Sequence, residues 1–176
     1  MTGTGDRALE DLLERLRTRF YGKYRGIVSD VDPSTMRIKA IVPSVLGETT
    51  TGWCMPCVPY AGSHVGFAFL PETGSGVWIE FEGGDVSYPI WTGGYWREGE
   101  VPPDVAANTA GQVKVIITVK HKLEFDDSQG TITLSDSNGN TVTLDSSGIK
   151  LANGPSSEVV VSSSSVSVNN GALEVQ

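Results

Sequence analysis

The stretch TITLSDSNGNTVTLDSSGIKL, residues 131–151, decides how the second half of this 176-residue chain folds. Its apolar residues come in pairs one residue apart, with polar residues between and after them. Because successive side chains of a strand point to opposite faces, each pair puts two apolar side chains on one face. The stretch predicts short antiparallel strands, apolar on one face and polar on the other, with a tight turn at 137–140, and a further turn is predicted directly after it at 152–154.

The same pattern extends in both directions from this stretch. A first run consists of Val113, Val115, Ile117 and Val119, and the remaining pairs are Leu123 and Phe125, Val159 and Val161, Val166 and Val168, and Leu173 and Val175. Eight such strands, stacked about 4.8 Å apart, would form a body roughly 40 Å long. A serine-rich disordered tail is the alternative, but such a tail would lack the alternation, which persists to Val175.

A single layer of these strands would leave its apolar face in water. Three copies wrapped around one axis would bury that face and hide most strand edges. We therefore predict an intertwined trimeric β-helix over residues 113–176. Its core is expected to consist of Ile132, Leu134, Val142, Leu144, Ile149, Leu151, Val159, Val161, Val166 and Val168.

Composition divides the chain and excludes several classes of protein. Of its 14 Phe, Trp and Tyr residues, only Phe125 lies beyond residue 100, so two differently built bodies are expected. The net charge of −8 argues against nucleic-acid binding, which depends on Lys and Arg. The predicted organisation is a helix over 1–22, a barrel over 23–100, a linker over 101–112 and the trimeric body over 113–176.

The first segment has the spacing of an amphipathic helix. Asp6 is a candidate N-cap, the helix should end near Gly22, and the apolar stripe consists of Leu9, Leu12, Leu13, Leu16 and Phe20. A helix this short cannot form its own core, so the stripe must pack elsewhere. Its own domain, its own oligomer and a different protein all remain candidates.

Residues 23–100 have the pattern of a small antiparallel barrel of OB-fold type. Strands are predicted over residues 24–31, 36–42, 51–58, 66–70, 76–81 and 90–95. An OB-fold that binds nucleic acid combines aromatic residues with cations, and this barrel lacks the cations. Most of its rings are expected to be packing residues, with a sugar-stacking platform as the alternative: Trp53, Tyr60, Trp78, Trp91, Tyr95 and Trp96.

Cys54 and Cys57 reproduce the Trp-Cys-x-Pro-Cys pattern of thioredoxin-like redox sites. That chemistry needs a helix directly after the first Cys to lower its pKa, and the strand-like residues that follow argue against one. Buried structural thiols are the favoured interpretation, with a local disulfide or redox role and a metal site as alternatives. His64 and His121 have no nucleophile or carboxylate partner in any motif. We therefore expect no catalytic residue, cofactor or metal, and no enzyme activity.

Several motifs in the barrel and beyond it resemble one family. They are 24–28 (YRGIV), 37–43 (RIKAIVP), 46–47 (LG), 59–62 (PYAG), 70–85 (LPETGSGVWIEFEGGD), 89–93 (PIWTG), 121–127 (HKLEFDD), the 139–140 turn and 169–175 (NNGALEV). Over residues 24–97 they resemble the OB domain of contractile-tail spike proteins, a family that includes phage baseplate assembly protein V and the VgrG proteins of type VI secretion. The later motifs resemble the triple-stranded β-helix that follows this domain in the same family.

The resemblance implies a structural central spike of a contractile injection apparatus, whether a phage tail, a type VI system or an extracellular device. The implied partners are two further copies in a homotrimer, a separate hub or tube protein, other baseplate proteins and, transiently, the target envelope. The helix stripe would dock the hub. The end of the chain would bind a PAAR-repeat tip protein through Gly171, Ala172, Leu173, Glu174, Val175 and Gln176.

Some relatives carry a lysozyme domain between barrel and needle, and here the linker is too short for one. The chain is expected to be made in the cytoplasm and assembled at the centre of a baseplate in a phage-like particle, with release from the cell as a further possibility. The alternative function is an adhesin on a trimeric stalk, with envelope glycans bound by the barrel aromatics.

Overall fold

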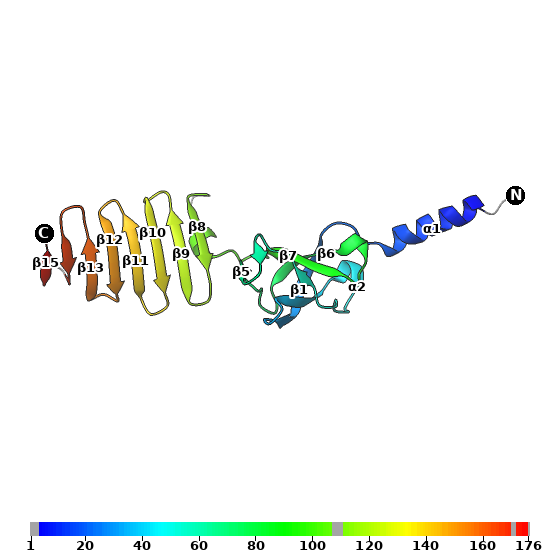
Figure 1. The fold of residues 1–176 in the computed structure, drawn as a ribbon, viewed down its shortest axis with the longest axis horizontal. Helices are drawn as coiled ribbons and strands as arrows, with labels where there is room; N and C mark the ends of the chain where they lie inside the picture. Colours follow the sequence, from blue (N-terminus) through cyan, green and yellow to red (C-terminus); the bar gives the residue numbers. More distant parts are fainter. Residues whose placement is uncertain (1–3, 107–110, 170–171, 176) are drawn as a thin grey trace. The chain divides into compact units, whose positions relative to one another are not determined.

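The computed structural model describes residues 4–106, 111–169 and 172–175 (Figure 1). The chain divides into two compact units, residues 1–100 and 101–176, and each is described by itself. Within the described residues, no helix has the length and apolar character needed to span a membrane. The chain is mostly β-structure with an N-terminal helix, as the sequence predicted.

Helix α1 runs from Thr4 to Thr18. It therefore begins before the predicted cap at Asp6 and ends earlier than Gly22. Phe20 was predicted on the helical stripe, and this is wrong, because the chain has already left the helix there. The Phe20 N–H donates to the Gly84 carbonyl at 2.8 Å, and its ring packs on the barrel core.

The first unit is built on a curled sheet with the strand order β2-β1-β6-β7-β3. These strands span Tyr24–Asp32 (β1), Arg37–Ile41 (β2), Met55–Pro56 (β3), Gly76–Phe81 (β6) and Pro89–Tyr95 (β7). β3 pairs in parallel with β7, while Cys54 and Thr50 just before it form isolated bridges to Ile38 and Ile41 of β2. The segment from 50 to 56 thus joins both edges of the sheet and closes it as an OB-type barrel.

The interior of this barrel accounts for almost all of the buried apolar side chains. They are Val28, Ile38, Ala40, Val42, Cys54, Val77, Ile79, Phe81 and Trp91. Along β6 the alternation of Val77, Ile79 and Phe81 with partly exposed Trp78 and Glu80 is the one that the sequence predicted. Two short helices lie between strands, α2 over Pro43–Leu46 and η1 over Glu82–Gly84.

The segment between β3 and β6 differs from the prediction. The strand expected over 51–58 is reduced to Met55–Pro56, and the strand expected over 66–70 is absent from this described part of the chain. In their place a tiny hairpin forms from β4 (Ala61–Gly62) and β5 (Val65–Gly66), and the chain then runs on without regular structure to residue 73. Val58 and Leu70 at its ends pack on the barrel core, but Val65, Phe67 and Phe69 between them are exposed, so their hydrophobicity did not indicate a core strand.

The second unit begins with a short helix, α3 (Pro103–Ala106), inside the predicted linker. An eight-stranded antiparallel sheet follows, in which the described strands pair in chain order. They are β8 (Val113–Ile117), β9 (His121–Asp126), β10 (Thr131–Asp136), β11 (Asn140–Asp145), β12 (Gly148–Asn153), β13 (Ser157–Val161), β14 (Val166–Val168) and β15 (Leu173–Val175). Asp136 and Asn140 flank one predicted turn. The other, predicted over 152–154, is shifted, because Ala152 and Asn153 belong to β12 and the turn occupies residues 154–156.

The first strand of this sheet corrects one prediction. Val113, Val115 and Ile117 were expected to start the apolar ladder, but β8 pairs with β9 so that Ile116 lies opposite Leu123. Ile116 therefore shares the ladder face, and the other three lie on the reverse face. Val113 is buried there, with α3 lying against β8. Val119 follows the strand and is 91% exposed.

Candidate functional site

Two rows of apolar side chains cross the sheet of the second unit on one face. The strand register places directly opposite one another Phe125, Ile132, Leu144, Ile149, Val161 and Val166 in the first row. The second row consists of Ile116, Leu123, Leu134, Val142, Leu151, Val159, Val168 and Leu173. All ten residues predicted as trimer core lie in these rows.

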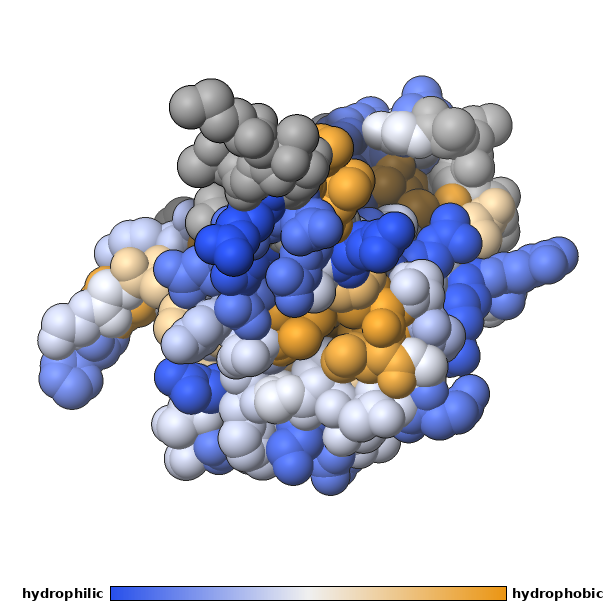
Figure 2. All heavy atoms as spheres, turned by 90° about the vertical axis from the view of Figure 1, so that its right-hand side faces the viewer, coloured by the Kyte–Doolittle hydropathy of each residue, from blue (hydrophilic) through white to orange (hydrophobic). Residues whose placement is uncertain are grey.

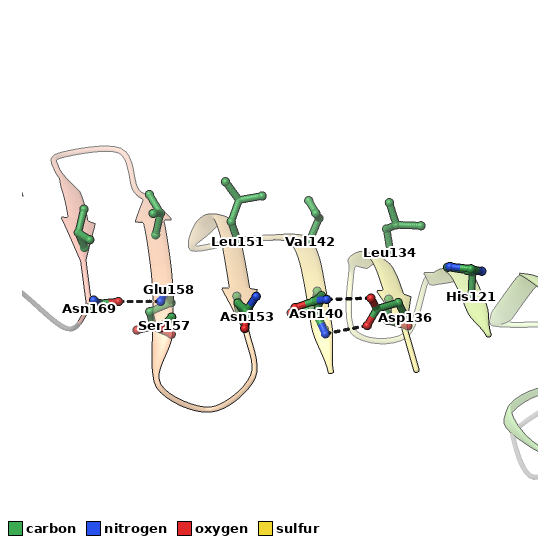
Figure 3. Close-up of a pocket in the computed structure, with 15 residues that line it drawn as sticks. His121, Leu134, Asp136, Asn140, Val142, Leu151, Asn153, Ser157, Glu158 and Asn169 are labelled. Atoms are coloured by element: carbon green, nitrogen blue, oxygen red, sulfur yellow. Dashed lines mark hydrogen bonds between the residues drawn. The ribbon is translucent and has the colours of Figure 1, made fainter. Parts of the chain in front are cut away.

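The rows are uncovered in the single chain. Leu134 is 51% exposed, Leu151 is 46% exposed and Leu173 is 60% exposed, and all three belong to the second row. In Figure 3 Leu134, Val142 and Leu151 point the same way from three adjacent strands. They line an open groove of about 570 Å³. A continuous apolar face of this size in water is unfavourable, and such faces mark interaction surfaces.

Beyond β8, the reverse face of the same sheet is largely polar. Thr143 of β11 lies between Thr133 and Lys150 of the neighbouring strands. Lys150 pairs with Glu158, and the Lys122 ammonium lies 3.0 Å from the Glu124 carboxylate and 3.3 Å from that of Asp104. Beyond β8 this face is compatible with water, so the large uncovered apolar surface of the sheet is the ladder face.

In three hairpin turns the last residue of the strand before the turn is an Asp. Asp126, Asp136 and Asp145 each accept N–H bonds from their own turn at 2.7 to 3.2 Å. The Asp136 carboxylate also accepts the Asn140 side-chain amide at 2.8 Å, drawn in Figure 3. These hydrogen bonds favour the ionised form, so the pKa of Asp136 falls to about 2 and those of Asp126 and Asp145 are also lowered. The turns therefore fix the strand register through ionised carboxylates.

Helix α1 offers a smaller apolar surface. Leu9, Leu12 and Leu13 are exposed, at 56%, 54% and 43%. The side chain of Leu16 lies outside the described part of the chain. Figure 2 shows one face of the whole chain, on which small groups of hydrophobic side chains (orange) lie between hydrophilic ones (blue).

The two thiols of the Cys-Met-Pro-Cys sequence have different environments, and both are free. Cys54 is fully buried in the barrel core with its sulfur 3.2 Å from the Thr51 hydroxyl, and burial raises its pKa. Cys57 is exposed, which corrects the prediction that both thiols are buried. A raised pKa is the reverse of what a redox nucleophile needs. Within the described residues no three His, Cys, Asp or Glu side chains are grouped so as to hold a metal.

The barrel aromatics divide into three groups. Trp91 is buried, and its indole N–H donates to the Met36 carbonyl at 3.1 Å. Trp78 packs on Tyr95 with ring centroids 5.2 Å apart, and the Arg25 guanidinium lies 5.8 Å from each ring. The remaining rings, Trp53, Tyr60 and Trp96, are exposed.

Sequence reasoning missed two parts of the exposed apolar surface. Ile116 was not assigned to the ladder, because β8 has apolar residues at both odd and even positions, and the sequence alone does not tell which of them share the ladder face. Three exposed residues around the β4–β5 hairpin were read otherwise, Tyr60 as a packing ring and Phe67 and Phe69 as barrel strand, and exposed Val65 was not assigned. The absence of charged residues from that part of the sequence was the available signal.

The last two strands of the sheet include the residues predicted to bind a tip protein. β15 pairs only with β14 among the described strands, so its outer edge is the end of the sheet. Leu173 and Ala172 are exposed there. Gly171 and Gln176 lie outside the described residues, as do the side chains of Glu174 and Val175.

Comparison with known protein families assigns both units. Residues 24–96 match the type VI secretion system/phage-baseplate injector OB domain. Residues 106–174 match the phage baseplate V C-terminal trimerisation domain, which supports a homotrimer. No curated protein matches the chain. The two matches follow one another in the order barrel, then trimerisation domain, and cover most of the sequence. The chain therefore belongs to the phage baseplate V family of structural injector spike proteins.

Proposed function

We propose that three copies of this chain form the central spike of a contractile injection apparatus, which joins the tube hub to a tip protein and pierces the target envelope. The observation that carries the proposal is the pair of uncovered apolar rows, of which the first runs from Phe125 in β9 to Val166 in β14 and the second from Ile116 in β8 to Leu173 in β15. Three such faces turned toward one axis cover each other. The two long edges of each sheet then lie beside neighbouring copies.

The core of this trimer would consist of the two rows. Their side chains are Val, Leu and Ile with one Phe, which suits a narrow core shared by three sheets. The polar faces, with Thr143 and the Lys150–Glu158 pair, would face solvent. Eight strands stacked about 4.8 Å apart make such a prism about 40 Å long. A long, narrow and hydrogen-bonded body is mechanically suited to transmit force along its length.

The two ends of the trimer would have different partners. Leu9, Leu12 and Leu13 of α1 are more than two-fifths exposed and carry the proposed docking to a hub or tube protein. The outer edge of β15, with Leu173 60% exposed, carries the proposed binding of a PAAR-repeat tip through residues 171–176. Unpaired strand edges and apolar side chains favour association with a further protein. The proposed role is mechanical, with no catalytic residue.

The function is tested by electron microscopy of particles from cells that express the chain together with the sheath and tube proteins of a contractile apparatus. Three copies should be resolved as a tapered density on the axis of the baseplate. Particles made with Val142→Asp should lack this density, whereas particles made with Thr143→Asp should keep it. A chain located on the periphery of the baseplate, or unchanged axial density with Val142→Asp, would contradict the proposal.

A further inference from the structure

A segment of the first unit projects apolar side chains that the proposed spike does not use. We call residues 58–70 the neutral arm. It contains β4 and β5, and its exposed apolar residues are Tyr60 at 55%, Val65 at 53%, Phe67 at 52% and Phe69 at 57%. Four large apolar side chains in thirteen residues, all more than half exposed, form an interaction surface rather than scattered exposure.

The arm has a defined conformation. The Phe67 N–H donates to the Tyr60 carbonyl at 2.9 Å, and Ala61 pairs with Gly66 across the hairpin. The rings of Phe67 and Phe69 stack with centroids 6.3 Å apart. At Gly66 an added Cβ would lie 2.8 Å from the Tyr60 carbonyl oxygen, so only glycine allows this close approach. The arm is therefore preorganised for a partner, which reduces the entropy lost on binding.

The charge distribution indicates the chemistry of that partner. The 23 residues between Glu48 and Glu72 include no Asp, Glu, Lys or Arg. At the chain average of 19% charged residues, about four would be expected there. An acidic or basic partner surface is recognised through countercharges, and the arm has none to offer. The partner surface is therefore neutral and apolar.

We propose that the neutral arm packs against the barrel of a neighbouring copy in the trimer. Each chain carries a net charge of −8, so like copies repel least where they meet on uncharged surface. Between the end of β7 at Tyr95 and the start of α3 at Pro103, residues 96–102 span at most roughly 25 Å, so association of the second units holds the three barrels near one another. Tethering at that distance gives a local concentration in the millimolar range. This inference rests on the proposed trimer, and it assigns the arm a role in holding the three barrels together.

The direct test places the photo-cross-linking residue p-benzoylphenylalanine at Phe67 of the full-length chain. Tyr88 is the matched control position, since its side chain is 61% exposed and its backbone is fixed: its N–H donates to the Asp85 carbonyl at 2.9 Å, and its carbonyl accepts from the Glu82 N–H at 3.0 Å. Irradiation of the Phe67 variant should give covalent chain pairs on a denaturing gel, with cross-linked peptides from residues 24–96 of the second chain. The Tyr88 variant should give no more than the background yield.

Light scattering of the same samples separates the two proposals. A trimer that gives no chain pairs from position 67, or cross-links only to residues 113–175, overturns the inference about the arm and leaves the spike proposal standing. A monomer overturns the proposed trimer itself.

A second measurement does not depend on the bulky probe. The double variant Phe67→Ser, Phe69→Ser should lower the melting temperature of the barrel by several degrees in the trimer. The same double variant in the Val142→Asp background, where the copies are separate, should lower it by much less. Equal shifts in the two backgrounds would show that these rings stabilise only their own barrel, and would overturn the inference.

Discussion

Replacing Val142 with Asp separates assembly from folding. In the single chain, position 142 lies between Leu134 and Leu151, which are 51% and 46% exposed. A carboxylate there keeps contact with water, so we expect a local cost of about 1 kcal/mol, the range of strand propensity. In the proposed trimer the same position faces the axis, and three carboxylates meet without partners.

The size of the effect follows from the titration of Asp. With an ordinary pKa of about 3.9, holding the carboxyl neutral at pH 7 costs about 4 kcal/mol per chain. Keeping it ionised and buried without a partner costs a similar amount, roughly 3–5 kcal/mol. Three chains therefore lose about 12 kcal/mol, which weakens trimer formation by roughly eight to nine orders of magnitude. We expect Val142→Asp to be monomeric at micromolar concentration.

The assay is light scattering coupled to size exclusion, with Thr143→Asp as the matched control. Thr143 is the next residue on the same strand but faces the polar side beside Lys150, so its variant should remain trimeric. All four Trp residues lie in the first unit, so their fluorescence checks that the barrel stays folded. A trimeric Val142→Asp protein, or dissociation of both variants alike, would refute the assignment of the ladder face.

Three further predictions concern other features. Cys57 should react rapidly with a maleimide and Cys54 slowly in the folded protein, because burial shields Cys54 and raises its pKa; equal rates would contradict the assigned burial. The melting temperature of the second unit should be level above about pH 4 and fall toward pH 2. The pKa of Asp136 is lowered to about 2 in the folded state, so its stabilising contribution is lost as the carboxylate protonates. Asp136→Asn should show a smaller fall in melting temperature over that range, and an identical fall would contradict this role. Deleting residues 171–176 should leave a folded trimer that no longer copurifies with the tip protein, and undiminished copurification would place the tip elsewhere.

The sequence predicted the parts of the fold in which polarity and periodicity agree. From β9 to β12 and in β14 each strand contributes two large apolar residues at alternate positions, so strand and face could be inferred. In β8 the run Val115-Ile116-Ile117 is apolar on both faces, and only its pairing with β9 reveals that Ile116 belongs to the ladder. The end of α1 was misplaced because Phe20 continues the helical spacing, whereas its ring is held by Tyr24 and Phe81 at centroid distances of 6.2 and 6.4 Å.

The neutral arm shows a different limit of sequence reasoning. Phe67 and Phe69 alternate like residues of a half-buried strand, and the prediction placed them in the barrel. Burial depends on what lies opposite a side chain in the complete assembly. The separate environments of Cys54 and Cys57 could not be inferred either. The barrel closes through residues 50–56, and of the two cysteines only Cys54 lies in this segment and bridges to β2.

The mass of the full-length protein in solution tests the central claim most directly. Each chain has a mass of 18.7 kDa, so a trimer has about 56 kDa, three times that value. Light scattering at micromolar concentration should return the trimer mass, and the value should persist on tenfold dilution because the apolar rows are continuous. A folded protein of 18.7 kDa, with the strand content of the second unit retained in circular dichroism, would contradict the account.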